Sequence, residues 1–514
     1  MADNRLIIEL AKRLNGVAVV SSDVKEEDIK GIEIESLTAY IVDYFKDKSK
    51  PGVLDKATLT GILDVKKSAA MPQIEIEVLG NASFKPVGKG SDLRFSIRSI
   101  KAEKTAGDVN DFARYFSDRL RKLKDIIQHG RNAKLGGMIN SVQSLGQYVN
   151  SREVTIAGLV YDKKITKNGH VLVTIDDETG SAKILFPRPE RNVTPEVLAM
   201  FDEAQKIVLD EVIAVRGKLS GDSSSKDPFL IAYYLARPDI PIHQRRTCEE
   251  ELGIAFMSDT HFGSRLFLDK QFTKFLEWIN GSLDYNKAAA EKVRALVISG
   301  DLVDGIGVYP NQQKELAVDD IYKQYAMLFE SLSKIPEYVH IFVLTGNHDA
   351  VQRAEPQPVL PNELTSGLRQ SNMHLVSNPG YVTIEGIRIL SYHGTSLDSV
   401  IQGIQGCSYS KPETAMVELL KRRHLSPIYG DNPIVPSRVD QMVMEDVPDI
   451  LHMGHLHKNG YSDYHGTLVI NSGTWQARTS YQQKLGHMPT PAMLPVYDAH
   501  KGTLSALDFN SATE

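Results

Sequence analysis

The chain has 514 residues, too many for one hydrophobic core, so we expect two to four domains. Its 42% hydrophobic and 24% charged residues are typical of a folded protein, and its formal net charge of -6 argues against a protein that holds nucleic acid by bulk positive charge alone. The two cysteines provide no disulfide framework, and neither a signal-peptide pattern at 1–5 nor an apolar run of membrane-spanning length is found, which favours a cytoplasmic protein with no membrane association.

The first 46 residues carry the spacing of short helices. Apolar residues recur at intervals of three to four within 5–14 and 34–45, and Ser36 is a candidate cap for the second helix. We therefore predict a small helical domain at 1–46. Two roles stay open for it, a simple structural bundle and a docking module for a partner protein.

The interval 47–138 is predicted to be a linker that contains one amphipathic helix. Residues 74–78 alternate in polarity like an edge strand. Residues 109–127 place apolar side chains on one stripe, with Asp108 as the cap and Gly130 as the stop. The other face of this helix is basic and holds Arg114, Arg119, Arg121, Lys122 and Lys124. We interpret that face as solvated, with a nucleic-acid contact as the alternative.

Residues 139–245 show the pattern of a small β-barrel. Five short strand-like runs lie at 154–160, 171–175, 182–186, 212–217 and 229–233. Glycine-containing turns separate them, and a helix is expected near 194–204. This arrangement fits a five-stranded OB-type β-barrel. Such a barrel binds single-stranded DNA by stacking, but the strands hold few aromatics, so bracing the next domain is an equally open role.

The last predicted domain, 246–514, contains five stretches built to one plan, in which an apolar run ends in Asp, Asn or His. The runs end in Asp259-Thr-His261, Gly300-Asp301, Gly346-Asn347-His348-Asp349, His393-Gly394 and Gly454-His455-Leu-His457. Helical patterns near 270–280, 318–334 and 412–423 lie between them. Strands that alternate with helices imply an α/β sandwich, which places ligands at the carboxyl ends of its strands.

The mixture of side chains at these strand ends points to a metal centre. Carboxylate, amide and imidazole groups together suit manganese, iron or zinc. Two ions that share one carboxylate generate hydroxide near neutral pH and clamp the attacking and leaving oxygens of a displacement at phosphorus. Each stretch alone is a weak signal, whereas five in this order, each after a strand pattern, are a specific one.

The order Asp-x-His, Gly-Asp, Gly-Asn-His-Asp, His-Gly, Gly-His-x-His resembles the calcineurin-like metallophosphoesterase superfamily over residues 250–475. The resemblance implies a four-layer α/β sandwich with two divalent metal ions, Mn2+ first among them, with Fe2+ or Zn2+ as alternatives. It implies that the first ion is held by Asp259, His261, Asp301 and His457. It implies that the second ion is held by Asp301, Asn347, His393 and His455, with Asp301 bridging. His348 would then protonate the leaving oxygen or stabilise the transition state.

With a helical N-terminus and a barrel ahead of this domain, the chain resembles the small (exonuclease) subunits of archaeal family D DNA polymerases. The phrases that end in Ser264, Gly305 and Asp349 look like theirs. The resemblance implies a proofreading 3'-to-5' DNA exonuclease that acts on single-stranded or primer-template DNA beside a large catalytic polymerase subunit, with the sliding clamp as a further candidate partner. The rival functions are a calcineurin-like phosphatase and a non-catalytic polymerase scaffold subunit.

One position departs from the pattern of the related DNA-repair nucleases. They carry a histidine three residues after the bridging aspartate, where this chain has Asp304. Asp304 has two open roles, to orient His348 through a hydrogen bond or to act as an ordinary supporting acid. Two further histidines, His424 and His452, match no motif and are interpreted as structural. Residues 309–312 are a candidate lining of the substrate groove.

Overall fold

The computed structural model describes residues 84–87, 92–100, 103–130, 135, 137–148, 153–190, 193–220, 229–365 and 371–512, together with 10–12, 14, 18–21, 24–25, 38, 41, 52–54, 56 and 59. Contacts divide the chain into two units, Met1–Met71 and Pro72–Glu514.

In the first unit, β1 (Ala18–Val20) pairs in parallel with β2 (Gly52–Leu54). Residues 10–12 are helical, and the buried Leu10 and Leu14 share one face, as the sequence predicts. The remainder of that helix, most of the helix predicted at 34–45 and the strand predicted at 74–78 lie outside the described residues.

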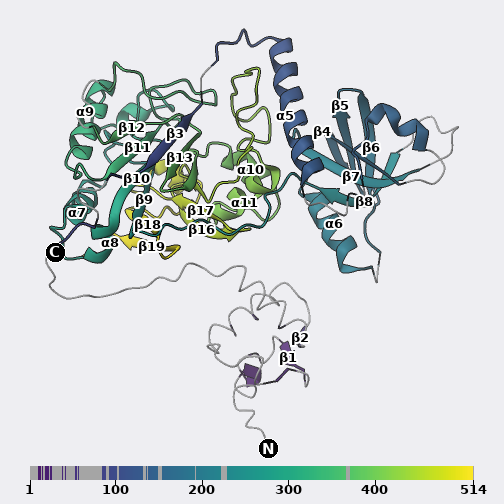
Figure 1. Ribbon diagram of the computed structural model, residues 1–514, viewed down its shortest axis with the longest axis horizontal. Coiled ribbons are helices and arrows are strands. Elements are labelled where there is room, and N and C mark those ends of the chain that lie inside the picture. Colours follow the sequence, from purple (N-terminus) through teal and green to yellow (C-terminus); the bar gives the residue numbers. More distant parts are fainter. Residues whose placement is uncertain are drawn as a thin grey trace, which may run out of the picture. The chain divides into compact units, whose positions relative to one another are not determined.

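The second unit contains two six-stranded mixed sheets (Figure 1). The first sheet has the order β12-β11-β10-β9-β18-β19. Its strands are β9 (Gly253–Met257), β10 (Val293–Ser299), β11 (His340–Leu344), β12 (Met373–Leu375), β18 (Met493–Asp498) and β19 (Thr503–Asp508). The four strands from β9 to β12 are parallel, and every residue of β9 and β10 is buried, because both faces of the sheet are covered.

The second sheet has the order β16-β17-β15-β14-β13-β3. Its strands are β3 (Phe95–Ser99), β13 (Gly380–Ile384), β14 (Ile387–Ser391), β15 (Ile450–Met453), β16 (Asn459–Tyr464) and β17 (Thr467–Ser472). The edge strand β3 was not predicted. It comes from the interval expected to be a linker and pairs antiparallel with β13, with Ile97 opposite Val382.

Helices cover the outer faces of both sheets and complete four layers (Figure 1). Side chains such as Phe256 and Ile389 fill the space between the sheets. The outer face of the first sheet packs against α7 (Asp269–Ile279), α8 (Lys287–Lys292) and α9 (Ile321–Leu332). The outer face of the second packs against α10 (Leu397–Gly403) and α11 (Pro412–Arg422). The predicted four-layer α/β sandwich is confirmed.

A closed barrel precedes the sandwich, with the strand order β4-β5-β6-β8-β7. Its strands are β4 (Glu153–Ile165), β5 (Val171–Asp177), β6 (Gly180–Phe186), β7 (Val212–Leu219) and β8 (Phe229–Ala236). The helix α6 (Pro195–Gln205) lies between β6 and β7, and the 3-10 helix η2 (Val142–Tyr148) precedes β4. Alternate residues of β5 point inward, since Val171, Val173 and Ile175 are buried. The predicted five-stranded barrel is confirmed.

The predicted amphipathic helix is α5 (Val109–His129). Asp108 caps it by accepting a hydrogen bond from the backbone N–H of Asp111, and Gly130 ends it. The prediction of a uniformly solvated basic face is wrong at Arg119, which is only 1% exposed. Its guanidinium donates to Asp440 Oδ2 at 2.7 Å and to the carbonyl of Pro427 at 3.0 Å, because the segment between α11 and β15 packs on that side of the helix.

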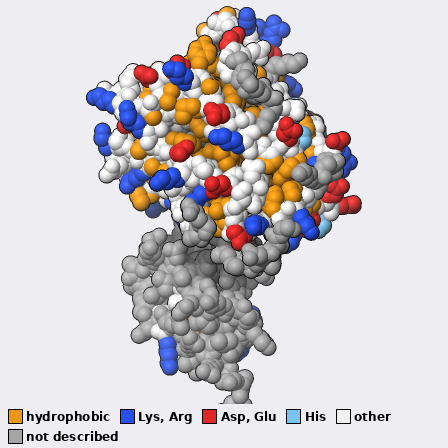
Figure 2. Space-filling model, turned by 90° about the vertical axis from the view of Figure 1, so that its left-hand side faces the viewer, with side chains coloured by type: hydrophobic (Ala, Val, Ile, Leu, Met, Phe, Trp, Pro, Cys, Tyr) orange, Lys and Arg blue, Asp and Glu red, His pale blue; other side chains and the backbone are white. Residues whose placement is uncertain are grey.

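No helix among the described residues is long and apolar enough to cross a membrane. On the face shown in Figure 2, side chains of both charges are scattered among apolar ones. The charges on this face do not form a patch of a single sign, in keeping with the modest net charge of -6.

Candidate metal centre

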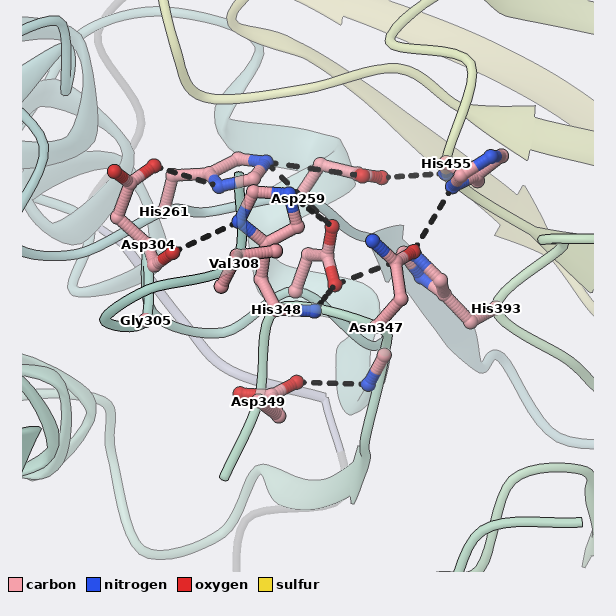
Figure 3. A network of polar contacts seen from close by, with 12 residues as sticks. Asp259, His261, Asp304, Gly305, Val308, Asn347, His348, Asp349, His393 and His455 are labelled. Atoms are coloured by element: carbon pink, nitrogen blue, oxygen red, sulfur yellow. Dashed lines mark hydrogen bonds and ion pairs between the residues drawn. The ribbon is translucent and has the colours of Figure 1, made fainter. Parts of the chain in front are cut away.

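All seven predicted ligands and His348 follow strands whose carboxyl ends meet at one place. Figure 3 labels six of these eight residues, Asp259, His261, Asn347, His348, His393 and His455. Asp259 and His261 follow β9, Asp301 follows β10, and Asn347 and His348 follow β11. His393 follows β14, while His455 and His457 follow β15. The two sheets therefore supply one cluster, and strand-end placement is what unites residues far apart in the sequence.

Four side chains form the first half of this cluster. The Nε2 atoms of His261 and His457 lie 3.0 Å apart. Asp259 Oδ1 lies 3.3 Å from His457 Nε2, and Asp301 Oδ2 lies 3.8 Å from His261 Nε2. The resemblance assigns these four residues to the first ion.

The second half is built around the amide oxygen of Asn347. This oxygen lies 3.0 Å from His393 Nε2 and 3.1 Å from His455 Nδ1. Asp301 Oδ1 lies 3.3 Å from His393 Nε2. The two carboxylate oxygens of Asp301 thus face different halves of the cluster, an arrangement that allows Asp301 to bridge two ions.

The spacing of these atoms fits divalent cations. Two ligand atoms at right angles around an ion, each about 2.1 Å from it, stand about 3 Å apart. Within the described part of the chain, no group donates a hydrogen bond to the buried Asp259 Oδ1, which is costly unless a cation lies beside it. The donor set of carboxylate, amide and imidazole suits manganese, iron or zinc.

Hydrogen bonds on the far side of each imidazole fix which nitrogen faces the cluster. His393 Nδ1 donates to the carbonyl of Ser299 at 2.8 Å, which leaves Nε2 as a lone-pair donor. His455 Nε2 lies 2.9 Å from Asp398 Oδ2, which leaves Nδ1. Carboxylates and carbonyls in this position orient metal-binding histidines and raise their basicity.

Asp304 contacts two histidines, His348 through its backbone carbonyl and His261 through its carboxylate. Its backbone carbonyl accepts a hydrogen bond of 2.8 Å from His348 Nδ1. Its carboxylate instead lies 3.1 Å from His261 Nδ1 and accepts from Gln476 Nε2 at 3.1 Å. The side chain of Asp304 therefore supports a ligand, while its main chain orients His348. Neither of the two roles considered from the sequence describes both contacts.

Five of the predicted ligands have left-handed backbone conformations that only glycine adopts at low cost. The φ angles are 51° at Asp259, 49° at His261, 48° at Asp301, 69° at His455 and 55° at His457. Backbone strain of this kind costs about 1–3 kcal/mol per residue and clusters at functional sites. Gly300 is required beside them, because a Cβ at this position would stand 2.6 Å from His393 Nδ1.

The cluster attracts positive charge. Burial opposes ionisation of Asp301, yet the imidazoles of His393 and His348 hold its pKa well below the usual range. Burial alone lowers the pKa of His393, but Asp301 outweighs it and raises that pKa to about 10. Burial and the charge of Asp301 raise the pKa of Asp349 to about 7. Asp349 accepts hydrogen bonds from Gly346 N at 2.8 Å and Tyr325 OH at 2.9 Å, and so fixes the loop that carries Asn347.

Two supporting residues carried no signal in the sequence. Asp398 lies in α10, and only the folded chain places it against His455. Gln482 lies in the short helix α12 (Ser480–Lys484), with its Nε2 2.8 Å from His457 Nδ1.

The two histidines interpreted as structural lie apart from the ligands. His452 bonds to the hydroxyls of Ser391 and Ser472, each at 2.9 Å, and burial lowers its pKa to about 3. His424 Nε2 lies 2.9 Å from Asp440 Oδ2.

Comparisons with known proteins point to one family. Residues 254–460 match the family of B-type subunits of DNA polymerases alpha and epsilon, and residues 154–232 match the family "OB-fold nucleic acid binding domain". The chain is similar to the DNA polymerase II small subunit of Archaeoglobus fulgidus, with 41% identity over 76% of this chain and 75% of that protein. It is 36% identical to that of Methanothermobacter thermautotrophicus, over 79% and 80% of the two chains, and 34% identical to that of Pyrococcus horikoshii, over 85% and 70%.

Proposed function

Because the chain belongs to the family of archaeal DNA polymerase II (family D) small subunits, we propose that it is the 3'-to-5' DNA exonuclease of a replicative polymerase. The observation that carries the proposal is the division of the Asp301 carboxylate between two groups of ligand atoms. A non-catalytic subunit has no need of that geometry. The same proposal assigns 139–245 to an OB-fold domain and 246–514, completed by β3, to the exonuclease domain.

Two divalent ions, Mn2+ first with Fe2+ or Zn2+ as alternatives, fit this cluster. Asp259, His261, Asp301 and His457 would hold one, and Asp301, Asn347, His393 and His455 the other. When bound, such ions polarise the scissile phosphate and lower the pKa of the attacking water.

His348 is the proposed catalytic residue. Its Nδ1–H is committed to the carbonyl of Asp304, so Nε2 faces the cluster, 3.9 Å from Asp301 Oδ2. In hydrolysis the attacking water releases one proton to solvent, its oxygen bonds to phosphorus and the P–O3' bond breaks; Nε2 regains a proton from solvent after the step. Protonated Nε2 gives its proton to the leaving O3', which then departs as a neutral hydroxyl.

The partners follow from the family and the barrel. A large catalytic polymerase subunit is the expected protein partner, as the name of the relatives implies, and the sliding clamp is a further candidate. Single-stranded or primer-template DNA is the substrate. The match of 154–232 to a nucleic acid binding family supports a DNA-binding role for the barrel.

The test is a cleavage assay of the chain with and without Mn2+, on single-stranded DNA, on matched and 3'-mismatched primers, and on a phosphate monoester. We expect mononucleotides to be released from 3' ends only with the metal. Cleavage of the monoester alone would replace the proposal by the phosphatase function. Cleavage of neither substrate, with the large subunit still bound, would leave the scaffold function.

A further inference from the structure

The short helix α12 lies directly against the metal centre. Its Gln482 contacts the predicted ligand His457, and a capping box between Thr479 and Gln482 fixes its first turn. Both atoms of the Gln482 amide are engaged, Oε1 by Thr479 N and Nε2 by His457 Nδ1, and these contacts set the position of α12 relative to the predicted ligands.

Large apolar side chains of α12 and the residues after it are left in solvent. Tyr481 is 67%, Leu485 52% and Met488 63% exposed. Nearby, the ring of Tyr409 stacks on His487 with centroids 4.4 Å apart. Exposed apolar side chains gathered beside a site are typical of a binding surface.

Tyr309 brings a further aromatic ring close to the catalytic residue. Its ring centroid lies 6.0 Å from that of His348. Its hydroxyl donates to Glu315 Oε2 at 3.1 Å, and Ser480 Oγ donates to Glu315 Oε1 at 2.7 Å. Glu315 thus joins the loop that carries Tyr309 to the start of α12. We call Tyr309, Tyr409, Tyr481, Leu485 and Met488 the aromatic rim.

Cations without carboxylate partners accompany the aromatic rim. Lys458 follows the predicted ligand His457, Arg478 precedes α12, and Lys484 is the last residue of α12. Within the described part of the chain none of the three takes part in an ion pair. Tyr481 is the exposed ring of the rim, whereas Tyr309 and Tyr409 are half-buried. A cationic groove with an aromatic ring that stacks on bases is a common way to bind single-stranded nucleic acid, because the cations attract phosphates.

We propose that the aromatic rim, with Tyr481 as its main platform, stacks the unpaired 3'-terminal bases of a DNA strand and thereby selects frayed ends. This inference rests on the proposed exonuclease function. A base must leave its own stack before it can lie on Tyr481, and a mismatched base leaves at lower cost than a paired one. The rim would therefore favour mismatched ends because they fray at lower cost. It needs no contact that distinguishes a mismatched base from a matched one.

The test separates binding from cleavage. In full-length His348→Ala protein with Mn2+, fluorescence anisotropy measures the Kd for a single-stranded oligothymidylate. Tyr481→Ala should raise Kd about fivefold to a hundredfold, and Tyr481→Phe should leave it unchanged, because the phenyl ring still stacks. Tyr322→Ala is the matched control, since Tyr322 lies on α9 and is 62% exposed. With His348 intact, Tyr481→Ala should raise KM with little change in kcat.

For an oligonucleotide with abasic 3'-terminal positions, the Kd should be the same for the protein with Tyr481 and for the Tyr481→Ala variant, because no base is present to stack. An unchanged Kd in Tyr481→Ala, or an equal loss on the abasic strand, would overturn the inference. So would loss of the large subunit with strand binding intact, because the rim would then be a protein-docking surface. Absence of DNA cleavage by the unaltered chain would refute the exonuclease proposal alone, and the Kd comparison would still decide the stacking inference.

Discussion

Removal of the Asp398 carboxylate should weaken one metal site and spare the other. Asp398 Oδ2 lies 2.9 Å from His455 Nε2, while Nδ1 of the same ring faces Asn347 Oδ1 at 3.1 Å. The carboxylate therefore holds the proton on Nε2 and leaves Nδ1 free for an ion. None of the ligands assigned solely to the first ion contacts Asp398, so only the second ion should be affected.

The size of the expected loss in metal affinity follows from the exposure of the Asp398–His455 pair. Outer partners of this kind contribute about 10- to 100-fold to metal affinity. The Asp398 side chain is 46% exposed, so solvent screens its charge. Asparagine still accepts the hydrogen bond, and Asp398→Asn should therefore weaken the binding of the second ion about tenfold. Alanine loses both charge and hydrogen bond, and Asp398→Ala should approach the hundredfold limit.

Calorimetric titration of the metal-free chain with Mn2+ would measure the dissociation constants of both ions. Asp125→Asn is the matched control, because it removes the carboxylate of another Asp–His pair, the exposed pair on α5 in which Asp125 lies 3.0 Å from His129. Two unchanged dissociation constants in Asp398→Ala, or equal losses at both sites, would refute the role given to this carboxylate.

Three further predictions test the site and its supports. His348→Ala should slow cleavage of single-stranded DNA about 10²- to 10⁴-fold, while calorimetry still finds two Mn2+ sites; an unchanged rate would exclude its proton transfer. Arg119→Met removes the guanidinium partner of the buried Asp440 carboxylate, so urea titration should show a loss of about 3–5 kcal/mol in the free energy of unfolding of the unit containing α5. Arg114→Met is the control and should cost less, because the Arg114 side chain is 56% exposed. Burial and Arg119 lower the pKa of folded His424 from 6.5 to about 4, so the unfolded chain binds an extra proton between these values. Stability should therefore fall as pH drops through this window, by about 2 kcal/mol between pH 7 and pH 5, and urea titrations of His424→Asn should lack this component.

The strands and the barrel were predictable from the sequence because they are local patterns. A buried parallel strand such as β10 is a continuous apolar run, and its ligand Asp301 follows directly. The first three barrel strands, β4 to β6, are joined by short turns, so each of them indicates where the next one begins. The roles of the seven ligands came from family resemblance, and the structure adds that their atoms lie close together.

Contacts between distant segments were not predictable. The strand β3 alternates in burial, but nothing local says that Ile97 pairs with Val382. Helical periodicity places Arg119 on the polar side of α5 and cannot reveal that Asp440 covers it. Asp304 was recognised as unusual, yet only the structure shows that its carboxylate and its carbonyl serve different histidines.

The edge strand β3 sets the order in which this protein can fold during synthesis. Residues 95–99 leave the ribosome first, then all five barrel strands, and only much later the partner strand at 380–384. Among the described residues no barrel strand pairs with a strand of the sandwich, so the barrel can be complete while β3 is still unpaired. An unpaired strand is an aggregation hazard, and Arg94 and Arg98 at this edge are the kind of charges that blunt it. The two-sheet sandwich therefore closes late, around a strand that is made before the barrel.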